Sequence, residues 1–179
     1  MDTQPYEGNV GDPEFQHVCV DARGERIVIR RVQEKDSEAL LDMYTQFENQ
    51  DYVPGMLVRA PKHWRHLVKM ALAQPVNLIG LAGDEAVVHA CILDIQPWVR
   101  TELEISVRPD LRGRGLGTAM LSAVVAVARQ CGYHELWQTV DSDNASAIGL
   151  YSKFGFVFVG GMSRERDMVL KLRKEKLDG

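Results

Sequence analysis

The stretch Val107-Arg108-Pro109-Asp110-Leu111-Arg112-Gly113-Arg114-Gly115-Leu116-Gly117-Thr118 places three glycines and three arginines between two regular elements. Before it, residues 101–108 alternate apolar and polar side chains, which predicts a strand. After it, apolar residues recur at the spacing of a helix: Leu116, Met120, Val124, Val127 and Cys131. Glycine permits tight loops, and the first N–H groups of a helix lack intrahelical partners. The loop therefore predicts an anion site suited to a diphosphate, with Arg112 and Arg114 adding charge-assisted hydrogen bonds.

Two common phosphate-binding loops do not fit this stretch. A Rossmann fingerprint requires glycine where Thr118 stands, and a nucleoside-triphosphate loop requires a lysine that this stretch lacks. From the residues alone, the alternative is a glycine-rich turn whose arginines are solvated.

The composition is that of an ordinary globular chain. Of the 179 residues, 45% are hydrophobic and 26% are charged, and the formal net charge is −4. These values argue against wholesale disorder and against a dedicated nucleic-acid-binding protein. The longest apolar stretch, residues 119–128, is about half of a membrane span, and three distant cysteines form neither a metal pattern nor a disulfide framework. We expect no nucleic-acid or membrane partner, no metal, and a cytoplasmic location.

The order of elements along the chain predicts a mixed α/β layer fold with one strand–helix–strand crossover. Strands are expected at residues 26–32, 76–81, 86–95, 101–108, 134–140, 156–159 and 168–172. Helices are expected from Ser37, after Pro61, at 116–131 and at 145–154. We predict a single domain over residues 25–173. The N-terminal tail 1–24 is expected to be partly ordered, with a short strand near His17–Val20, and the tail 174–179 to fray.

Two segments of the chain resemble the GNAT N-acetyltransferases. Arg112-x-x-Gly115-x-Gly117, after a strand that ends in Val107-x-Pro109, is similar to the acetyl-CoA signature of that family. Asp143-Asn144-Ala145-Ser146-Ala147-Ile148-x-Leu150-Tyr151-x-x-Phe154-Gly155-Phe156 is similar to its second motif, and one strand separates the two. The resemblance covers about residues 27–172. It implies the GNAT fold, in which helices flank a central, twisted, mostly antiparallel sheet.

The resemblance also implies a site for acetyl-CoA. The acetyl carbonyl and the pantetheine arm are expected on the strand backbone at Ile105, Ser106 and Val107. The pyrophosphate is expected on the N–H groups of Arg112, Gly113, Arg114, Gly115, Leu116, Gly117 and Thr118. Asn144 resembles the residue that approaches the cofactor arm. Tyr151 resembles the general acid of the family and is expected beside the cofactor.

Acylation requires a neutral amine, so a base or a water relay must accept a proton. Glu102 and Glu104 share one strand face beside the expected acetyl site, and either could be that base or could simply face solvent. A bulge in the strand would reverse their orientation, so the sequence leaves open which glutamate faces the cleft. Residues 141–143 could form an acidic mouth for a cationic amine, or cap the helix at Ala145 through Asp143 or Asn144.

We therefore predict an acetyl-CoA-dependent N-acetyltransferase that acts on a primary amine by direct attack in a ternary complex. The alternatives are a catalytically idle acetyl-CoA sensor, a transferase for a longer acyl-CoA, and a nucleotide-binding protein. The sequence does not name the amine, which belongs to a protein or a small molecule. Aromatic residues of the region that lines the acceptor site in the family could form a substrate wall or core: Tyr44, Phe47, Tyr52 and Trp64. A homodimer is expected only by analogy with the family.

Overall fold

The computed structural model describes residues 15–47, 64–96 and 100–172. In this part of the chain, an eight-stranded sheet has the order β1-β2-β3-β4-β5-β6-β8-β7. Its strands are β1 Gln16–Val20, β2 Arg26–Arg31, β3 Val76–Ala82, β4 Glu85–Gln96, β5 Arg100–Val107, β6 Glu135–Asp141, β7 Val157–Val159 and β8 Glu165–Lys171. Neighbouring strands are antiparallel except β5 and β6. The expected mixed, mostly antiparallel sheet is confirmed.

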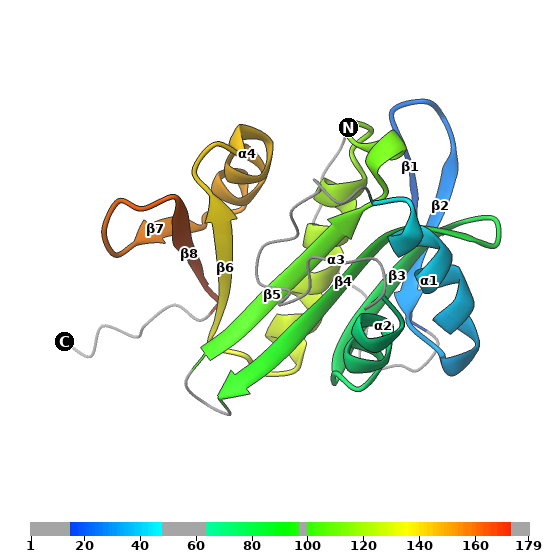
Figure 1. Cartoon of the computed structure of the whole chain (residues 1–179), viewed down its shortest axis with the longest axis horizontal. Helices are drawn as coiled ribbons and strands as arrows, with labels where there is room; N and C mark the ends of the chain where they lie inside the picture. Colours follow the sequence, from blue (N-terminus) through cyan, green and yellow to red (C-terminus); the bar gives the residue numbers. More distant parts are fainter. Residues whose placement is uncertain (1–14, 48–63, 97–99, 173–179) are drawn as a thin grey trace.

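Helices cover both faces of this sheet. They are α1 Ser37–Thr45, α2 Trp64–Leu72, α3 Leu116–Gln130 and α4 Ala145–Lys153. Figure 1 shows α1 and α2 on one face and α3 on the other, with α4 beside the end of β6. No helix within the described residues has the length and apolar character needed to cross a membrane.

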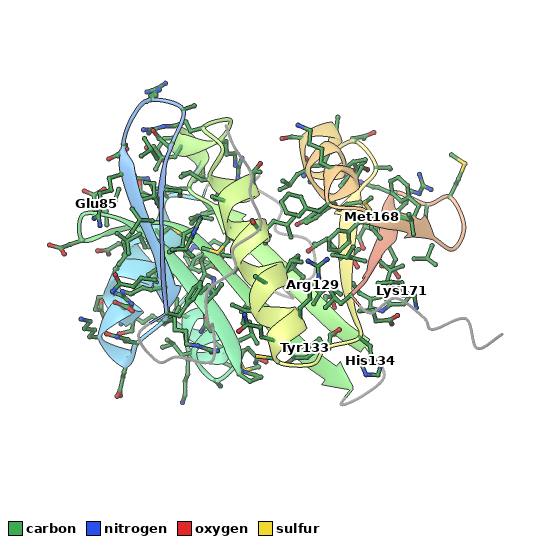
Figure 2. The ribbon with its side chains drawn as sticks, turned by 180° about the vertical axis from the view of Figure 1, so that it is seen from behind. Glu85, Arg129, Tyr133, His134, Met168 and Lys171 are labelled. Atoms are coloured by element: carbon green, nitrogen blue, oxygen red, sulfur yellow. The ribbon has the colours of Figure 1, made fainter. Side chains whose placement is uncertain are left out.

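The long helix α3 forms the main core with the sheet. Its buried residues include the predicted stripe Leu116, Met120, Val124 and Val127, and Figure 2 shows it from behind, lying across the strands with Tyr133 near its C-terminal end. The prediction that Cys131 continues the buried apolar face of this helix is wrong. The helix ends at Gln130, so Cys131 is its C-cap and is exposed, and the chain turns away at Gly132 with φ 83°.

The sheet begins within the segment that the sequence assigned to the N-terminal tail. Strand β1 pairs with β2 from Gln16 opposite Arg30 to Val20 opposite Arg26, and Phe15 is buried in the main core. Residues 1–14 and 173–179, which make up most of the two predicted tails, lie outside the described residues. The boundaries of the single domain stay a prediction.

The parallel pair β5 and β6 shapes the site. The two strands are in register at Glu102 and Trp137, and Figure 1 shows them separating from there toward their C-terminal ends. The end of β5 leads through the glycine-rich loop into α3, whereas the end of β6 leads into α4. The divergence therefore brings two helix N-termini to the same edge of the sheet.

Candidate functional site

A cleft of about 1030 Å³ opens where β5 and β6 diverge. The end of β5, the glycine-rich loop with the start of α3, and β6 with α4 form its walls. All but one of the sequence-predicted binding residues line it: Ile105, Ser106, Val107, Arg112, Gly113, Gly115, Leu116, Gly117, Thr118, Asn144 and Tyr151. The exception among them is Arg114. Of the two candidate bases, Glu104 lines the cleft and Glu102 does not.

The glycine loop has the geometry of an anion site. Gly113 and Gly115 have φ angles of 75° and 89°, in the left-handed region that favours glycine. Gly115 is the N-cap of α3 and has no side chain to satisfy the first N–H groups of the helix. A Cβ at Gly117 would lie 3.2 Å from Leu150 Cδ2, so glycine lets the start of α3 approach α4 closely. These features fit a diphosphate held by peptide N–H groups.

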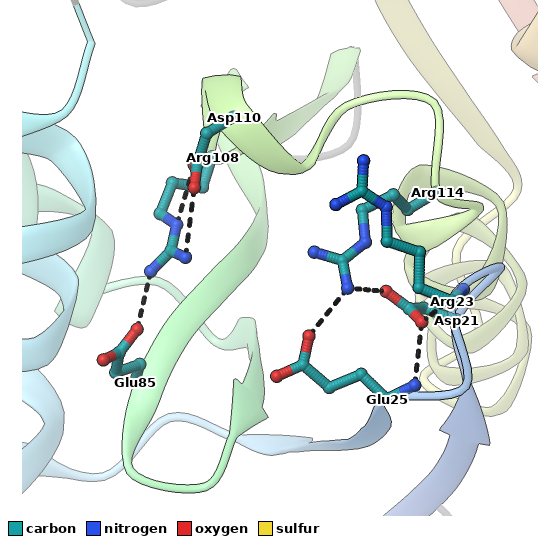
Figure 3. A network of polar contacts seen from close by, with 7 residues as sticks. All are labelled: Asp21, Arg23, Glu25, Glu85, Arg108, Asp110 and Arg114. Atoms are coloured by element: carbon teal, nitrogen blue, oxygen red, sulfur yellow. Dashed lines mark hydrogen bonds and ion pairs between the residues drawn. The ribbon is translucent and has the colours of Figure 1, made fainter.

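Arg114 points away from the cleft, which corrects the expectation that its guanidinium adds charge there. Its Nη2 lies 2.5 Å from Asp21 Oδ2 and 2.8 Å from Glu25 Oε2, at the turn between β1 and β2. Figure 3 shows both ion pairs. The backbone of Arg114 is tied to the same turn, because Ala22 N–H donates to its carbonyl at 3.0 Å. The side chain turns this way because two carboxylates lie on that side. Arg114 therefore anchors the loop to the β1–β2 turn.

The other two arginines of the loop also have defined positions. Arg108 pairs with Glu85 at 2.8 Å and with Asp110 at 2.9 Å, which ties the start of the loop to the β3–β4 turn. Arg112 lines the cleft, and its guanidinium carbon lies 5.6 Å from the centre of the Phe47 ring. Arg112 is thus the loop arginine whose side chain is placed to meet a ligand.

The register of β5 decides the orientation of the two glutamates. Opposite β4, Glu104 pairs with Cys91 and Glu102 with Leu93, without an irregularity between them. Both side chains therefore point to the face covered by α1. Glu102 accepts a hydrogen bond from the Thr139 hydroxyl at 3.2 Å. Glu104 is 2% exposed, and its Oε1 has no hydrogen-bond partner among the described residues.

Glu104 and Tyr151 are electrostatically linked across the cleft. Burial and then the charge of Glu102 raise the pKa of Glu104 well above its ordinary value. Tyr151 is 4% exposed and packs on Phe156 with ring centres 5.2 Å apart. Burial and then the charge of Glu104 raise the pKa of Tyr151, so its hydroxyl is protonated at neutral pH. A proton acceptor from β5 and a proton donor from α4 thus meet in one cleft.

The residues after β6 cap α4 and also line the cleft. Asn144 is the N-cap, and its side chain accepts from Ala147 N–H at 3.1 Å, which confirms the capping interpretation for this residue. Asp141 accepts from Asp143 N–H at 3.0 Å and pairs with Arg164 at 3.3 Å. Because Arg164 lines the same mouth, the mouth carries both signs of charge rather than being purely acidic.

Some polar groups at the cleft were not anticipated from the sequence. Gln138 occupies an inward position of β6 between Leu136 and Val140, donates to the Thr139 carbonyl at 2.9 Å, and leaves its Oε1 without a partner in the described structure. The sequence signal that could have identified Gln138 is a polar residue at a position where the alternation of the strand predicts a buried apolar one. Across residues 15–47, 64–96 and 100–172, no group of three or more His, Cys, Asp or Glu side chains could hold a metal ion.

The aromatic residues considered for the acceptor site have different positions. Tyr44 stacks on Trp64 with ring centres 5.5 Å apart, and both belong to the small core between α1, α2 and the sheet. Phe47 belongs to the same core and also lines the cleft. Tyr52 lies outside the described residues.

Comparison with known proteins agrees with this geometry. The sequence model of the acetyltransferase (GNAT) family matches residues 37–156. The chain belongs to the GNAT family. Among solved structures, the GNAT domain of S. lividans PAT superposes with a TM-score of 0.77 at 19% identity, covering 87% of this chain and 96% of that one. A Salmonella typhimurium structure with its cofactor acetyl-CoA gives 0.66 at 20% identity, covering 86% and 98%. At these identities the likeness concerns the fold alone.

Curated relatives match over shorter regions of this GNAT protein. The L-methionine sulfoximine/L-methionine sulfone acetyltransferase of Pseudomonas aeruginosa is 34% identical over 92 residues, which is 49% of this chain and 54% of that protein. The L-amino acid N-acyltransferase MnaT of Escherichia coli is 36% identical over 61 residues, 34% of this chain and 36% of that protein. The chain therefore spans about half or less of the length of these relatives.

Proposed function

We propose that this GNAT protein transfers the acetyl group of acetyl-CoA to a primary amine by direct attack in a ternary complex. One observation carries the proposal. Glu104, with its raised pKa, and the protonated Tyr151 face the cleft that the glycine loop also lines. Acyl transfer to an amine requires an acceptor for the amine proton and a donor for the departing sulfur. The raised pKa makes Glu104 a stronger base than an ordinary glutamate, and Tyr151 carries the proton to be donated.

The donor site is assigned to the loop and to β5. Peptide N–H groups from Arg112 to Thr118 hold the pyrophosphate, with the Arg112 side chain adding charge. Because β5 has separated from β6 at Ile105–Val107, peptide groups on that side are available to the pantetheine arm and the acetyl carbonyl. When bound, acetyl-CoA supplies an activated thioester. Polarisation of its carbonyl by a peptide N–H stabilises the charge that develops during attack.

Glu104 and Tyr151 then move the protons. The amine nitrogen forms a bond to the acetyl carbon while the carbon–sulfur bond breaks. Glu104 takes one proton from the amine, directly or through water, and Tyr151 gives its proton to the departing sulfur. The products are the acetylated amine and the free thiol. Return of the proton from Glu104 to Tyr151, directly or through water, restores both groups.

An α-amino group of a small amino acid is the first acceptor class to test. The α-amine of a polypeptide, with a pKa of about 7.7–8.0, is at least about half neutral at pH 8, whereas a lysine amine near 10.4 costs about 4 kcal/mol to neutralise at pH 7.4, so an α-amine is the easier of the two to deprotonate. The names of the matched relatives, an L-methionine sulfoximine/L-methionine sulfone acetyltransferase and an L-amino acid N-acyltransferase, support the α-amino class.

The test begins with binding and proceeds to turnover. Acetyl-CoA at about 100 times its Kd adds about 2.7 kcal/mol to stability, so melting is compared with and without it, with ATP and NAD as controls. Release of free CoA is then measured with L-methionine sulfone, other L-amino acids and a lysine peptide, for the wild type and Tyr151→Phe. We expect a shift with acetyl-CoA alone and amine-dependent CoA release that falls in Tyr151→Phe with little change in KM.

Each alternative has its own outcome in this design. Stabilisation by acetyl-CoA with no amine-dependent release would favour an idle sensor. Faster release of free CoA from a longer acyl-CoA than from acetyl-CoA would show that the longer acyl-CoA is the preferred donor. Stabilisation by ATP or NAD but not by acetyl-CoA would reject the proposed donor site and the transferase with it.

A further inference from the structure

A buried chain of hydrogen bonds links the C-terminal part of α2 to the hydroxyl of Tyr44 on α1. Asn77 Nδ2 donates to the Ala71 carbonyl at 2.6 Å, and Asn77 Oδ1 meets His89 Nε2 at 2.7 Å. His89 Nδ1 in turn meets the Tyr44 hydroxyl at 2.8 Å. Ser106 stands directly opposite His89 in the register of β4 and β5, so its side chain is on the same face of the sheet as the His89–Tyr44 pair, and it lines the cleft. The chain, whose members come from α2, β3, β4 and α1, therefore ends beside one cleft residue of β5.

The direction of every hydrogen bond in this chain is fixed from its far end. The Ala71 carbonyl can only accept, so Asn77 presents its amide nitrogen to it and its oxygen to His89. That oxygen requires a proton on His89 Nε2, which leaves Nδ1 as an acceptor in the neutral ring. Burial lowers the pKa of His89 to about 4, so the ring is neutral. The Tyr44 hydroxyl must therefore donate its proton to His89.

This polarity determines what Ser106 can do. With its proton committed to His89, Tyr44 offers only lone pairs to its neighbour, so Ser106 is the donor in any hydrogen bond between them. Ser106 is 4% exposed, and its Oγ has no hydrogen-bond partner among the described residues. A Ser106 proton that turns toward the Tyr44 oxygen leaves the lone pairs of Oγ for a ligand in the cleft.

The chain cannot serve as a proton exit. It ends at an amide and a backbone carbonyl, Asn77 and Ala71, and neither group exchanges protons readily near neutral pH. His89 is difficult to charge because it is buried. The hydrogen bonds among Asn77, His89 and Tyr44 therefore fix the orientation of these side chains rather than carry protons.

We propose that Ser106 accepts a hydrogen bond from the amine of the acceptor substrate, and that Tyr44, His89 and Asn77 are positioning residues that hold Ser106 in the accepting orientation. The inference rests on the proposed function. Glu104 and Ser106 are two residues apart on one face of β5, and both have unpartnered buried oxygens in the same cleft. The neutral primary amine has two N–H donors. With one N–H bound to Ser106 and the other proton passing to Glu104 during attack, the direction of the nitrogen lone pair is fixed.

The first experiment separates binding of the amine from binding of the donor. With L-methionine sulfone as the probe amine, Ser106→Ala is expected to raise KM for the amine about fivefold to tenfold, the effect of one neutral hydrogen bond. The affinity for acetyl-CoA, measured by calorimetry, is expected to stay within about twofold, because the strand backbone holds the donor. Ile92→Val is the matched control, since Ile92 is buried on the opposite face of β4.

A double-mutant cycle tests whether Tyr44 acts through Ser106. Tyr44→Phe keeps the ring that stacks on Trp64 and removes only the hydroxyl. We expect it to raise KM for the amine in the wild-type background and to have no further effect in Ser106→Ala. A purely structural role predicts equal, additive effects in both backgrounds. Additive effects on KM would therefore overturn the positioning role.

A measurement without turnover tests the polarity itself. Nitrogen-15 NMR of the imidazole of His89, assigned with a His89→Gln variant, is expected to show a neutral ring protonated at Nε2. Protonation at Nδ1 would reverse the chain and overturn the proposal. Wild-type turnover with an unchanged KM in Ser106→Ala would overturn the role of Ser106 alone. Absence of amine-dependent turnover in the wild type, despite acetyl-CoA binding, would reject the transferase and this role with it.

Discussion

Glu102 and Glu104 stand two residues apart on the same face of β5, but only Glu104 lines the cleft. The Thr139 hydroxyl, 3.2 Å away, holds Glu102 at the point where β5 and β6 are still paired. Glu104 lies one pleat further along, where the strands have diverged. One carboxylate can therefore reach a substrate, while the other acts on it at a distance by adding to the rise in its pKa.

Glu104→Gln is expected to lower kcat for amine acetylation by about 10²- to 10⁴-fold, the usual contribution of a general base. The isosteric amide keeps the packing but cannot accept the amine proton. Affinity for acetyl-CoA is expected to change little, because the loop and the β5 backbone hold the donor. The measurements are steady-state CoA release and calorimetric binding of acetyl-CoA.

The matched variant Glu102→Gln is expected to keep activity and to change its pH dependence. Glu104 must be deprotonated to accept a proton, so activity rises with pH through the pKa of Glu104. Removing the charge of Glu102 removes the second cause of the raised pKa. The acidic limb of kcat/KM should therefore move to lower pH. Loss of activity in Glu102→Gln with retention in Glu104→Gln would reverse the two roles.

Glu104→Gln is also expected to stabilise the protein at neutral and alkaline pH. Burial raises the pKa of Glu104 well above its ordinary value of 4.5, so the folded protein keeps this proton up to a higher pH than the unfolded chain does. Between those two pKa values the unfolded chain loses its proton and the folded protein keeps it, so the stability of the wild type falls as pH rises. The glutamine variant does not pay this penalty.

Melting curves from pH 4.5 to pH 8 test this expectation. The gain in Tm of Glu104→Gln over wild type should be small at pH 4.5, grow with pH, and level off above the pKa of Glu104. Glu38→Gln, at an exposed site, corrects for the loss of one charge. A gain in Tm that is the same at every pH would show that ionisation of Glu104 is not its cause.

The elements governed by local pattern could be predicted from the sequence. The alternation in residues 101–108 placed both glutamates on one face of the strand, and the register with β4 confirms this, with Leu103 buried in the main core on the other face. The glycine loop was likewise located because positive φ angles and a helix start depend on neighbouring residues. Asn144 was one of two candidate caps for the same local reason.

The features that depend on distant contacts could not be predicted. The direction of the Arg114 side chain is set by Asp21 and Glu25, far away in the sequence. The divergence of β5 from β6 decides which glutamate lines the cleft, and no local pattern encodes that divergence. The hydrogen bonds of His89 depend in the same way on Tyr44 and Asn77, which come from other elements. Periodicity shows which face a side chain occupies but not which partner it meets there.

Gly115→Ala is expected to weaken acetyl-CoA binding, whereas Gly83→Ala is not. Both glycines have positive φ angles, 89° and 58°, so an alanine at either place costs about 1 kcal/mol or more of backbone strain. Only Gly115 is the N-cap of α3 in the cleft. We expect similar losses in Tm and a rise in Kd for acetyl-CoA of about tenfold in Gly115→Ala alone. Equal Kd values for the two variants would contradict the loop assignment.

Arg112 and Arg114 lie two residues apart in the loop and are expected to differ in what they stabilise. Arg112→Gln should raise Kd for acetyl-CoA about tenfold or more, the effect of a charge-assisted hydrogen bond, with little change in Tm. Arg114→Gln should mainly lower Tm, because it breaks the ion pairs with Asp21 and Glu25 and leaves the buried Asp21 carboxylate without its cation.

A mutant cycle separates anchoring from ligand contact at Arg114. In an Asp21→Asn/Glu25→Gln background the guanidinium has lost both carboxylates, so Arg114→Gln is expected to lower Tm much less than it does in the wild type. If Arg114 instead contacts the ligand, the same substitution raises Kd for acetyl-CoA as strongly as Arg112→Gln in both backgrounds. Because the two outcomes differ in Tm and in Kd, calorimetry and melting curves on the same variants decide whether the β1–β2 turn acts as the anchor of the loop.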